Sequence, residues 1–135
     1  MKIQEQIKEL AKHHFGDVIA LRRHLHQYPE LSKQEKETAN FICNYLGKLQ
    51  GVSFRRDIAG HGICGFVEGK PANKCVALRA DMDALPICEN TNLDFKSKNE
   101  GVMHACGHDV HMSVLLGAIT ILSELREQFS GKVMF

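Results

Sequence analysis

Apolar side chains recur with two different periods along this chain, and the change of period falls at Gly51. Between residues 3 and 49 they recur every three or four positions, which is the spacing of one face of an α-helix. From Val52 onward they alternate with polar residues or form short continuous runs, which is typical of strands. The pattern therefore predicts helices first and strands after them.

The helical half divides into two predicted helices. The first covers residues 3–27 and ends before Pro29, because the residue before a proline avoids the helical region. Ser32 and Glu35 form a capping box for a second helix, which ends near Gly51. The apolar face of the first helix comprises Ile3, Ile7, Leu10, His14, Val18, Leu21 and Leu25.

The rest of the chain predicts strands together with one more helix. Residues 75–78 form a continuous apolar run, which is expected of a strand covered on both faces. The order of elements indicates one α/β domain in which helices are layered on a mixed sheet. The predicted elements are strands over residues 52–58, 63–67 and 75–78, a turn over 70–73, a long loop over 89–101, a helix over 114–125 and a strand from 133.

Charge and composition exclude several classes of function. Lysine and arginine total 17 against 16 aspartate and glutamate, so no strong field favours nucleic acid or a membrane surface. The first residues, MKIQEQIKEL, lack an apolar signal core, and no later run approaches the length of a membrane span. The five cysteines share no short spacing, which predicts free thiols in a reducing cytoplasm rather than a disulfide framework.

Residues 104–111, HACGHDVH, carry the strongest chemical signal. In an extended segment His104, Cys106 and His108 would share one side, because they are two positions apart. The residues between them are small, so the backbone can fold closely around an ion. Thiolate and imidazole are ligands for zinc or a similar transition metal. Cys106 and His108 are therefore predicted metal ligands, with His104 and His111 as possible neighbours of the site.

Acidic residues form a second candidate group. Asp81 and Asp83 follow an apolar strand, at the edge where open α/β sheets build their sites. They could ligate a metal or accept the ring N–H of a metal-bound histidine. An acidic turn before Pro86 is the alternative, and this segment alone favours it. Asp109 suits the N-cap of the third helix, whose start also favours a neighbouring thiolate. Asp81 and Asp109 are therefore further possible neighbours of the site.

Three further histidines and one basic pair show no comparable clustering. His24, His26 and His61 are expected to lie on the surface or to pack against helices. The pair Arg22-Arg23 is expected to form a solvated helix face. None of these residues enters the predicted site.

Three motifs resemble those of the amidohydrolase branch of the aminoacylase and carboxypeptidase-type metallohydrolases. They are LRRHLHQYPELS at residues 21–32, RADMDALP at 79–86 followed by Glu89, and GVMHACGHDVH at 101–111. The branch includes hippurate hydrolases, auxin-conjugate hydrolases and N-acetyl-diaminopimelate deacetylases. The resemblance runs over nearly the whole chain in the same order, and HACGHD is highly specific. It implies the N-terminal part of a di-metal, aminopeptidase-like catalytic domain.

The resemblance also implies a function. Cys106 and His108 would bind a pair of divalent metals, often manganese, zinc, nickel or cobalt, and Asp83 would support the site through a ligand. The substrate would be a small N-acyl amino acid, whose amide is attacked by a metal-activated water while a glutamate moves the proton. In relatives that glutamate, further ligands and a lid or dimerisation domain follow the segment that matches residues 1–135. The chain is therefore expected to lack a complete catalytic set and to be inactive alone, whereas full-length relatives are homo-oligomeric.

Two other functions stay open on this evidence. The chain could be a non-catalytic fragment that keeps only a vestigial metal site. It could also be a thiol hydrolase that uses Cys106 as its nucleophile and a nearby histidine as the base. Dependence of activity on added metal would count against the thiol hydrolase.

Overall fold

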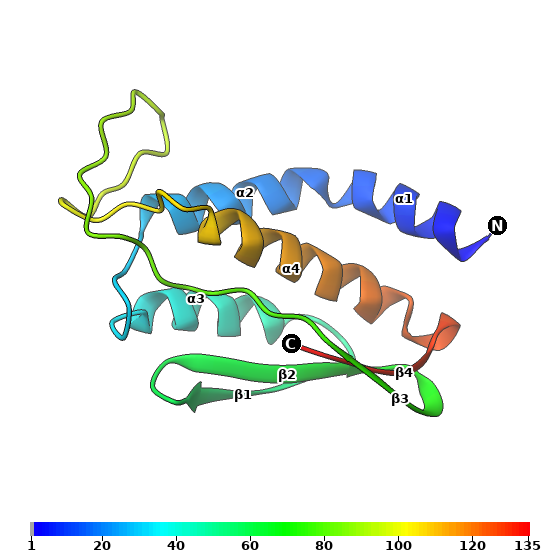
Figure 1. The fold of residues 1–135 in the computed structure, drawn as a ribbon. Helices are drawn as coiled ribbons and strands as arrows, with labels where there is room; N and C mark the ends of the chain where they lie inside the picture. The colour runs from blue at the N-terminus through cyan, green and yellow to red at the C-terminus, as the bar shows by residue number, and fades with distance from the viewer. Residues whose placement is uncertain (1) are drawn as a thin grey trace.

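Helices lie on one side of a four-stranded sheet in this protein (Figure 1). The computed structural model describes residues 2–135. The predicted α/β fold, with helices layered on a mixed sheet, is confirmed. In chain order the elements are α1 (Ile3–His13), α2 (Phe15–Gln27), α3 (Lys36–Leu46), β1 (Val52–Ile58), β2 (Gly62–Glu68), β3 (Lys70–Ala77), α4 (His108–Glu124), a 3-10 turn (Arg126–Gln128) and β4 (Ser130–Met134).

Strand β4 lies inside the sheet, whose order is β1-β2-β4-β3. It pairs antiparallel with β2 and parallel with β3, so the sheet is mixed. Only Gly69 separates β2 from β3 in the chain, yet β4 occupies the position between them. This arrangement makes β3 an edge strand.

The prediction of β3 contains two errors. The strand begins at Lys70, so the turn predicted over residues 70–73 is wrong. Its residues are exposed throughout, whereas the apolar run at residues 75–78 predicts a strand covered on both faces. Because β3 pairs with β4 alone in the described part of the chain, its outer side meets solvent.

The first predicted helix is in fact two helices that follow nearly the same direction (Figure 1). The break lies at His14, whose backbone angles are φ −86° and ψ 1°. The His14 imidazole is 2.6 Å from Glu124 Oε1 and 3.4 Å from Asp17 Oδ2, so it ties the break to α4. The apolar period continues across a one-residue break between nearly collinear helices, and for this reason it does not reveal the break.

A carboxylate from the preceding loop binds the start of α3. Glu30 accepts hydrogen bonds from the amides of Glu37 (3.1 Å) and Thr38 (2.7 Å). These amides have no partner inside the helix, and a negative charge is favourable at a helix start. The helix begins one residue after Glu35, so the capping box predicted from Ser32 is wrong.

The core lies between α2, α3, α4 and the sheet. Helix α2 packs along α4, and both α3 and α4 contact β2. This packing fixes the start of α4 against the carboxyl end of α2. No helix within residues 2–135 is long and apolar enough to cross a membrane. The buried residues of the core are Leu21, Leu25, Ile42, Leu46, Val67, Met112, Leu116 and Ile119.

Candidate metal centre

The chain turns sharply just before α4. Gly107 is the N-cap and has φ +122°, a conformation that L side chains rarely adopt. Asp109, which the sequence predicts as the N-cap, instead lies in the first turn of the helix and is buried. A flexible glycine at the turn removes the need for a side-chain cap, and this frees the Asp109 carboxylate for other partners.

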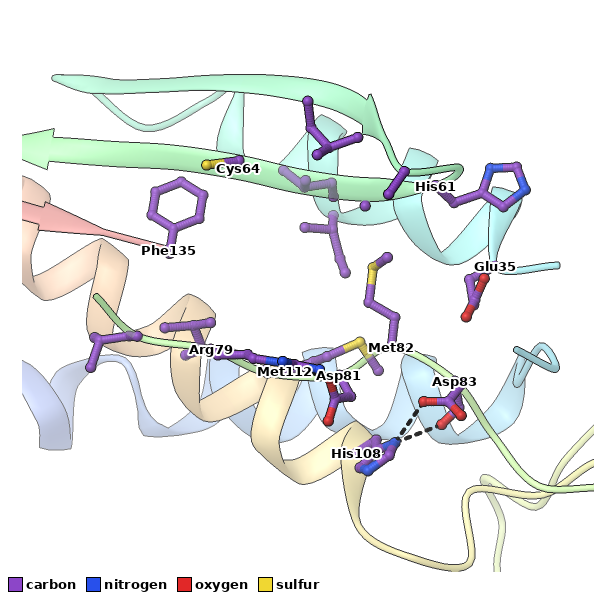
Figure 2. Close-up of a pocket in the computed structure, with 18 of the residues that line it drawn as sticks. Glu35, His61, Cys64, Arg79, Asp81, Met82, Asp83, His108, Met112 and Phe135 are labelled. Atoms are coloured by element: carbon purple, nitrogen blue, oxygen red, sulfur yellow. Dashed lines mark hydrogen bonds and ion pairs between the residues drawn. The ribbon is translucent and has the colours of Figure 1, made fainter. Parts of the chain in front are cut away.

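Asp83, in the segment after β3, holds the ring of His108 (Figure 2). His108 Nδ1 is 2.9 Å from the backbone oxygen of Asp83 and 3.1 Å from its Oδ1. Both oxygens accept, so Nδ1 donates and the lone pair of the ring is left on Nε2. A carboxylate that orients an imidazole in this way is a common support of a metal ligand.

A cavity of about 1050 Å³ lies beside this pair. His108, Asp83 and Asp81 line it, and Met82 and Met112 lie next to them (Figure 2). Carboxylates, an imidazole and apolar side chains therefore share one concave surface, which is the usual make-up of a small-molecule site.

Asp81 is paired with an arginine rather than with a histidine. Arg79 donates from Nε (3.0 Å) and Nη2 (2.7 Å) to Asp81 Oδ1. The hydrogen bond from Arg79 lowers the pKa of Asp81. Both residues line the cavity, so they bring an ion pair to the surface that His108 lines.

Cys106 lies outside this cavity. Its thiol is free and exposed, and it is two residues from His108 in the chain. Thiolate and imidazole fit zinc or a similar metal by their chemistry. Across residues 2–135, however, no group of three His, Cys, Asp or Glu side chains could hold a metal ion. Catalytic zinc sites use three protein ligands. Cys106 and His108 are ligands of a suitable type, but two side chains do not complete such a site.

The other two histidines of the motif lie in contrasting surroundings. His104 is buried, and neither of its ring nitrogens has a hydrogen-bond partner. Burial lowers the pKa of His104 to about 4, so the ring is neutral. His111 is exposed, with its ring 6.0 Å from that of His108. A bend at Cys106 and Gly107 interrupts the extended segment, and His104 is buried whereas Cys106 is exposed.

A buried group of charges joins α2 to the start of α4 and to Glu89, and no sequence motif predicted it. His26 Nδ1 is 2.7 Å from Asp109 Oδ2, and His26 Nε2 is 3.0 Å from Glu89 Oε1. Arg22 Nε is 3.1 Å from the same Asp109 oxygen, so Arg22 is only partly solvated, with 32% of its side chain exposed, whereas Arg23 is exposed as expected. The only local signal is that Arg22 and His26 are four residues apart on one helix face. Their partners lie more than sixty positions away in the chain.

The Glu89 carboxylate organises the loop that follows it. Burial alone would raise the pKa of Glu89. Hydrogen bonds from Thr91 Oγ1 (2.6 Å) and the Ser97 amide (2.6 Å), with the contact to His26, outweigh burial and lower the pKa to about 2. Glu89 is therefore ionised and joins the loop to α2.

Acid should destabilise the fold through Glu89. The carboxyl binds a proton near pH 4.5 when unfolded but near pH 2 when folded, so the unfolded state holds more protons between these values. The free energy of unfolding should therefore fall as the pH drops from about 4.5 towards 2. The free energy of unfolding, measured by urea denaturation at several pH values in this range, should depend less steeply on pH in Glu89→Gln than in the parent. Glu100→Gln, at an exposed position, is the matched control; equal slopes for the parent and Glu89→Gln would contradict the prediction.

Known proteins are similar to this chain in sequence and in fold. Residues 77–135 match the profile of peptidase family M20/M25/M40. An N-acyl-L-amino acid amidohydrolase from Geobacillus stearothermophilus is 46% identical over 132 residues, which cover 98% of this chain and 35% of that protein. The IAA-amino acid hydrolase ILR1-like 5 of Arabidopsis thaliana is 43% identical over 135 residues, which cover 98% of this chain and 31% of that protein.

A solved structure gives the same relationship. The crystal structure of the Bacillus subtilis YXEP protein, described as a dinuclear metal binding peptidase from the M20 family, matches this fold with a TM-score of 0.86 and 39% identity. The match covers 92% of this chain and 35% of that one. The chain therefore spans about a third of the length of its relatives.

Proposed function

Because the chain is related in sequence and in fold to peptidase family M20/M25/M40, we propose that residues 1–135 are the N-terminal portion of the catalytic domain of a metal-dependent amidohydrolase. The proposed reaction is hydrolysis of the amide bond of an N-acyl amino acid, as the name of the Geobacillus relative indicates for that protein. The observation that carries the proposal is the His108 ring, whose Nδ1 is engaged by Asp83 and whose Nε2 is left to bind a metal.

Each residue of the site has a proposed role. Cys106 and His108 would be the ligands, and manganese, zinc, nickel or cobalt all accept a thiolate with an imidazole. A bound divalent ion would polarise the amide carbonyl and lower the pKa of a water molecule. Asp83 keeps the proton of His108 on Nδ1. Two ions are proposed, because the related Bacillus structure is described as dinuclear.

The remaining parts of the site are proposed to come from the rest of the intact protein. Cys106 and His108 would supply two ligands, and no group of three candidate ligands is present in residues 2–135. A hydrolytic site also needs a further ligand and a group that moves the proton. We propose a small-molecule substrate and a cytoplasmic setting, in which all five cysteines can remain free, as the structure has them.

A thiol hydrolase is the second candidate, since the Cys106 thiol is free and exposed. A thiol nucleophile needs a base within hydrogen-bond distance. Among residues 2–135 no hydrogen bond joins the Cys106 thiol to His108, whose Nδ1 is held by Asp83, and both nitrogens of His104 are without a partner. The geometry therefore favours the metal-dependent reaction.

Removal of metal tests the proposal. We expect chelation to abolish hydrolysis of N-acetyl and N-benzoyl amino acids by the intact protein, and added Mn²⁺, Zn²⁺ or Co²⁺ to restore it, because the site depends on the ion. Release of the free amino acid measures the rate. Full activity of a protein shown to be metal-free would contradict the proposal. A metal-loaded protein that hydrolyses no amide would identify a vestigial site.

A further inference from the structure

The buried charges of His26, Asp109 and Glu89 have no role in the proposed function so far. Both ring nitrogens of His26 contact carboxylate oxygens, Asp109 at 2.7 Å and Glu89 at 3.0 Å. Ionised carboxylates only accept hydrogen bonds, so both nitrogens donate and the ring is a cation between two anions. The side chains of all three residues are at most 3% exposed. Such a bridge is stable only while each charge keeps its partner.

Asp109 connects this bridge to the proposed site. It follows His108 directly in the first turn of α4, and its Oδ2 accepts hydrogen bonds from His26 and Arg22, both on α2. On the other side Asp83 holds the His108 ring. The start of α4 is therefore fixed between two anchors, one on α2 and one on the segment after β3.

The ring of Phe95 closes the bridge from outside. It lies edge-on to the His26 imidazole, with ring centroids 5.5 Å apart, and 4.9 Å from the Arg22 guanidinium carbon. Phe95 belongs to the loop that Glu89 organises. Charge and apolar contact therefore keep His26 in one orientation.

We propose that His26 is a positioning residue for the metal site: by holding Asp109 it fixes the first turn of α4, and with it the ligands Cys106 and His108. The inference rests on the proposed function. Partners behind a ligand typically change metal affinity by about 10–100-fold when they are replaced. The effect passes through the Nδ1 arm of His26, which faces Asp109, and not through the Nε2 arm, which faces Glu89.

Two amide substitutions separate these arms. The amide nitrogen of asparagine lies near the position of histidine Nδ1, and that of glutamine near Nε2. His26→Asn therefore keeps a donor towards Asp109, whereas His26→Gln keeps one towards Glu89. Both variants remove the same positive charge, so each is a control for the other.

Metal titration of the apo form of the intact protein tests the proposal. We expect the Kd for Zn²⁺ to stay within about threefold of the parent in His26→Asn and to rise about 10–100-fold in His26→Gln. In the Co²⁺-loaded protein the thiolate charge-transfer band, which reports the bond to Cys106, should persist in the first variant and weaken in the second. His24→Gln, on the same helix but stacked on Phe41 at 3.8 Å, should match the parent.

Each other outcome has a defined meaning. Equal Zn²⁺ affinity in both His26 variants overturns the inference. A loss of affinity that is proportional to the loss of melting temperature, in the same way in both variants, also overturns it. Glu89→Gln leaves His26 and Asp109 in place and covers the case in which His26→Gln does not fold. Its affinity should stay within about threefold of the parent, and a tenfold loss overturns the inference. A parent that binds neither Zn²⁺ nor Co²⁺ overturns the proposed function as well.

Discussion

Replacing Cys106 with alanine should lower the hydrolysis of N-acyl amino acids by the intact protein about 10³-fold, and His108→Ala should do the same. Each change removes one of the two proposed ligands, and no group of three candidate ligands is present in residues 2–135 to replace it. A metal ion contributes several kcal/mol to the stabilisation of the transition state, and each 1.36 kcal/mol is a factor of ten in rate. Measured kcat/KM with N-acetyl and N-benzoyl amino acids gives the effect. Cys88→Ala removes another exposed thiol and should be neutral.

A substitution by aspartate distinguishes a ligand from a nucleophile at position 106. Cys106→Asp keeps an atom that binds a metal but removes the thiol. If Cys106 is a ligand, this variant should retain measurable, metal-dependent activity above that of Cys106→Ala. If the thiol attacks the substrate, both variants should be equally inactive, and alkylation should inhibit the parent even when metal is saturating. A fully active Cys106→Ala protein would remove both candidates.

Asp109→Ala should have the largest effect on stability, a loss of about 3–5 kcal/mol in the free energy of unfolding. The carboxylate is 1% exposed and is the partner of both His26 and Arg22. Without it the buried His26 loses one of its two carboxylates, and Arg22, whose side chain is 32% exposed, loses its partner. Urea denaturation at neutral pH measures the loss.

The comparison for Asp109→Ala is Asp94→Ala. Asp94 is exposed in the loop, so its removal should change the free energy of unfolding by no more than about 0.5 kcal/mol. Asp109→Asn, which keeps one acceptor oxygen, should lie between the two. A loss below about 1 kcal/mol in Asp109→Ala would show that the buried pair contributes little.

Local patterns in the sequence predicted the types of element but not how they meet. The change of period at Gly51 separated the helical half from the strands, as the structure has them. The edge position of β3 could not be read from its apolar run, because a strand buried by its own domain and one left at an edge have the same composition. The break at His14 was equally invisible, since it leaves the apolar face continuous.

The candidate site shows the same division between local and distant information. The HACGHDVH motif lies within residues 77–135, which match the profile of the family that it resembles. A bend at Cys106 and Gly107 interrupts the extended backbone on which the predicted shared side of residues 104, 106 and 108 depends. His26 was placed among the residues without a role in the site, because its two partners are 63 and 83 positions away in the chain. Ion pairs over such separations depend on the packing of α2 against α4, which no local pattern encodes.

The place of β4 has a consequence for how this sheet can form. Strands β2 and β3 are adjacent in the chain, but the strand that fills the space between them, Ser130–Met134, is synthesised only after α4. Until it leaves the ribosome, the facing edges of β2 and β3 carry unpaired backbone groups that a second nascent chain could bind. The pairing of β4 with β2 and β3 joins distant parts of the chain and is slow. The chain is therefore most prone to aggregate until β4 has paired with these two strands.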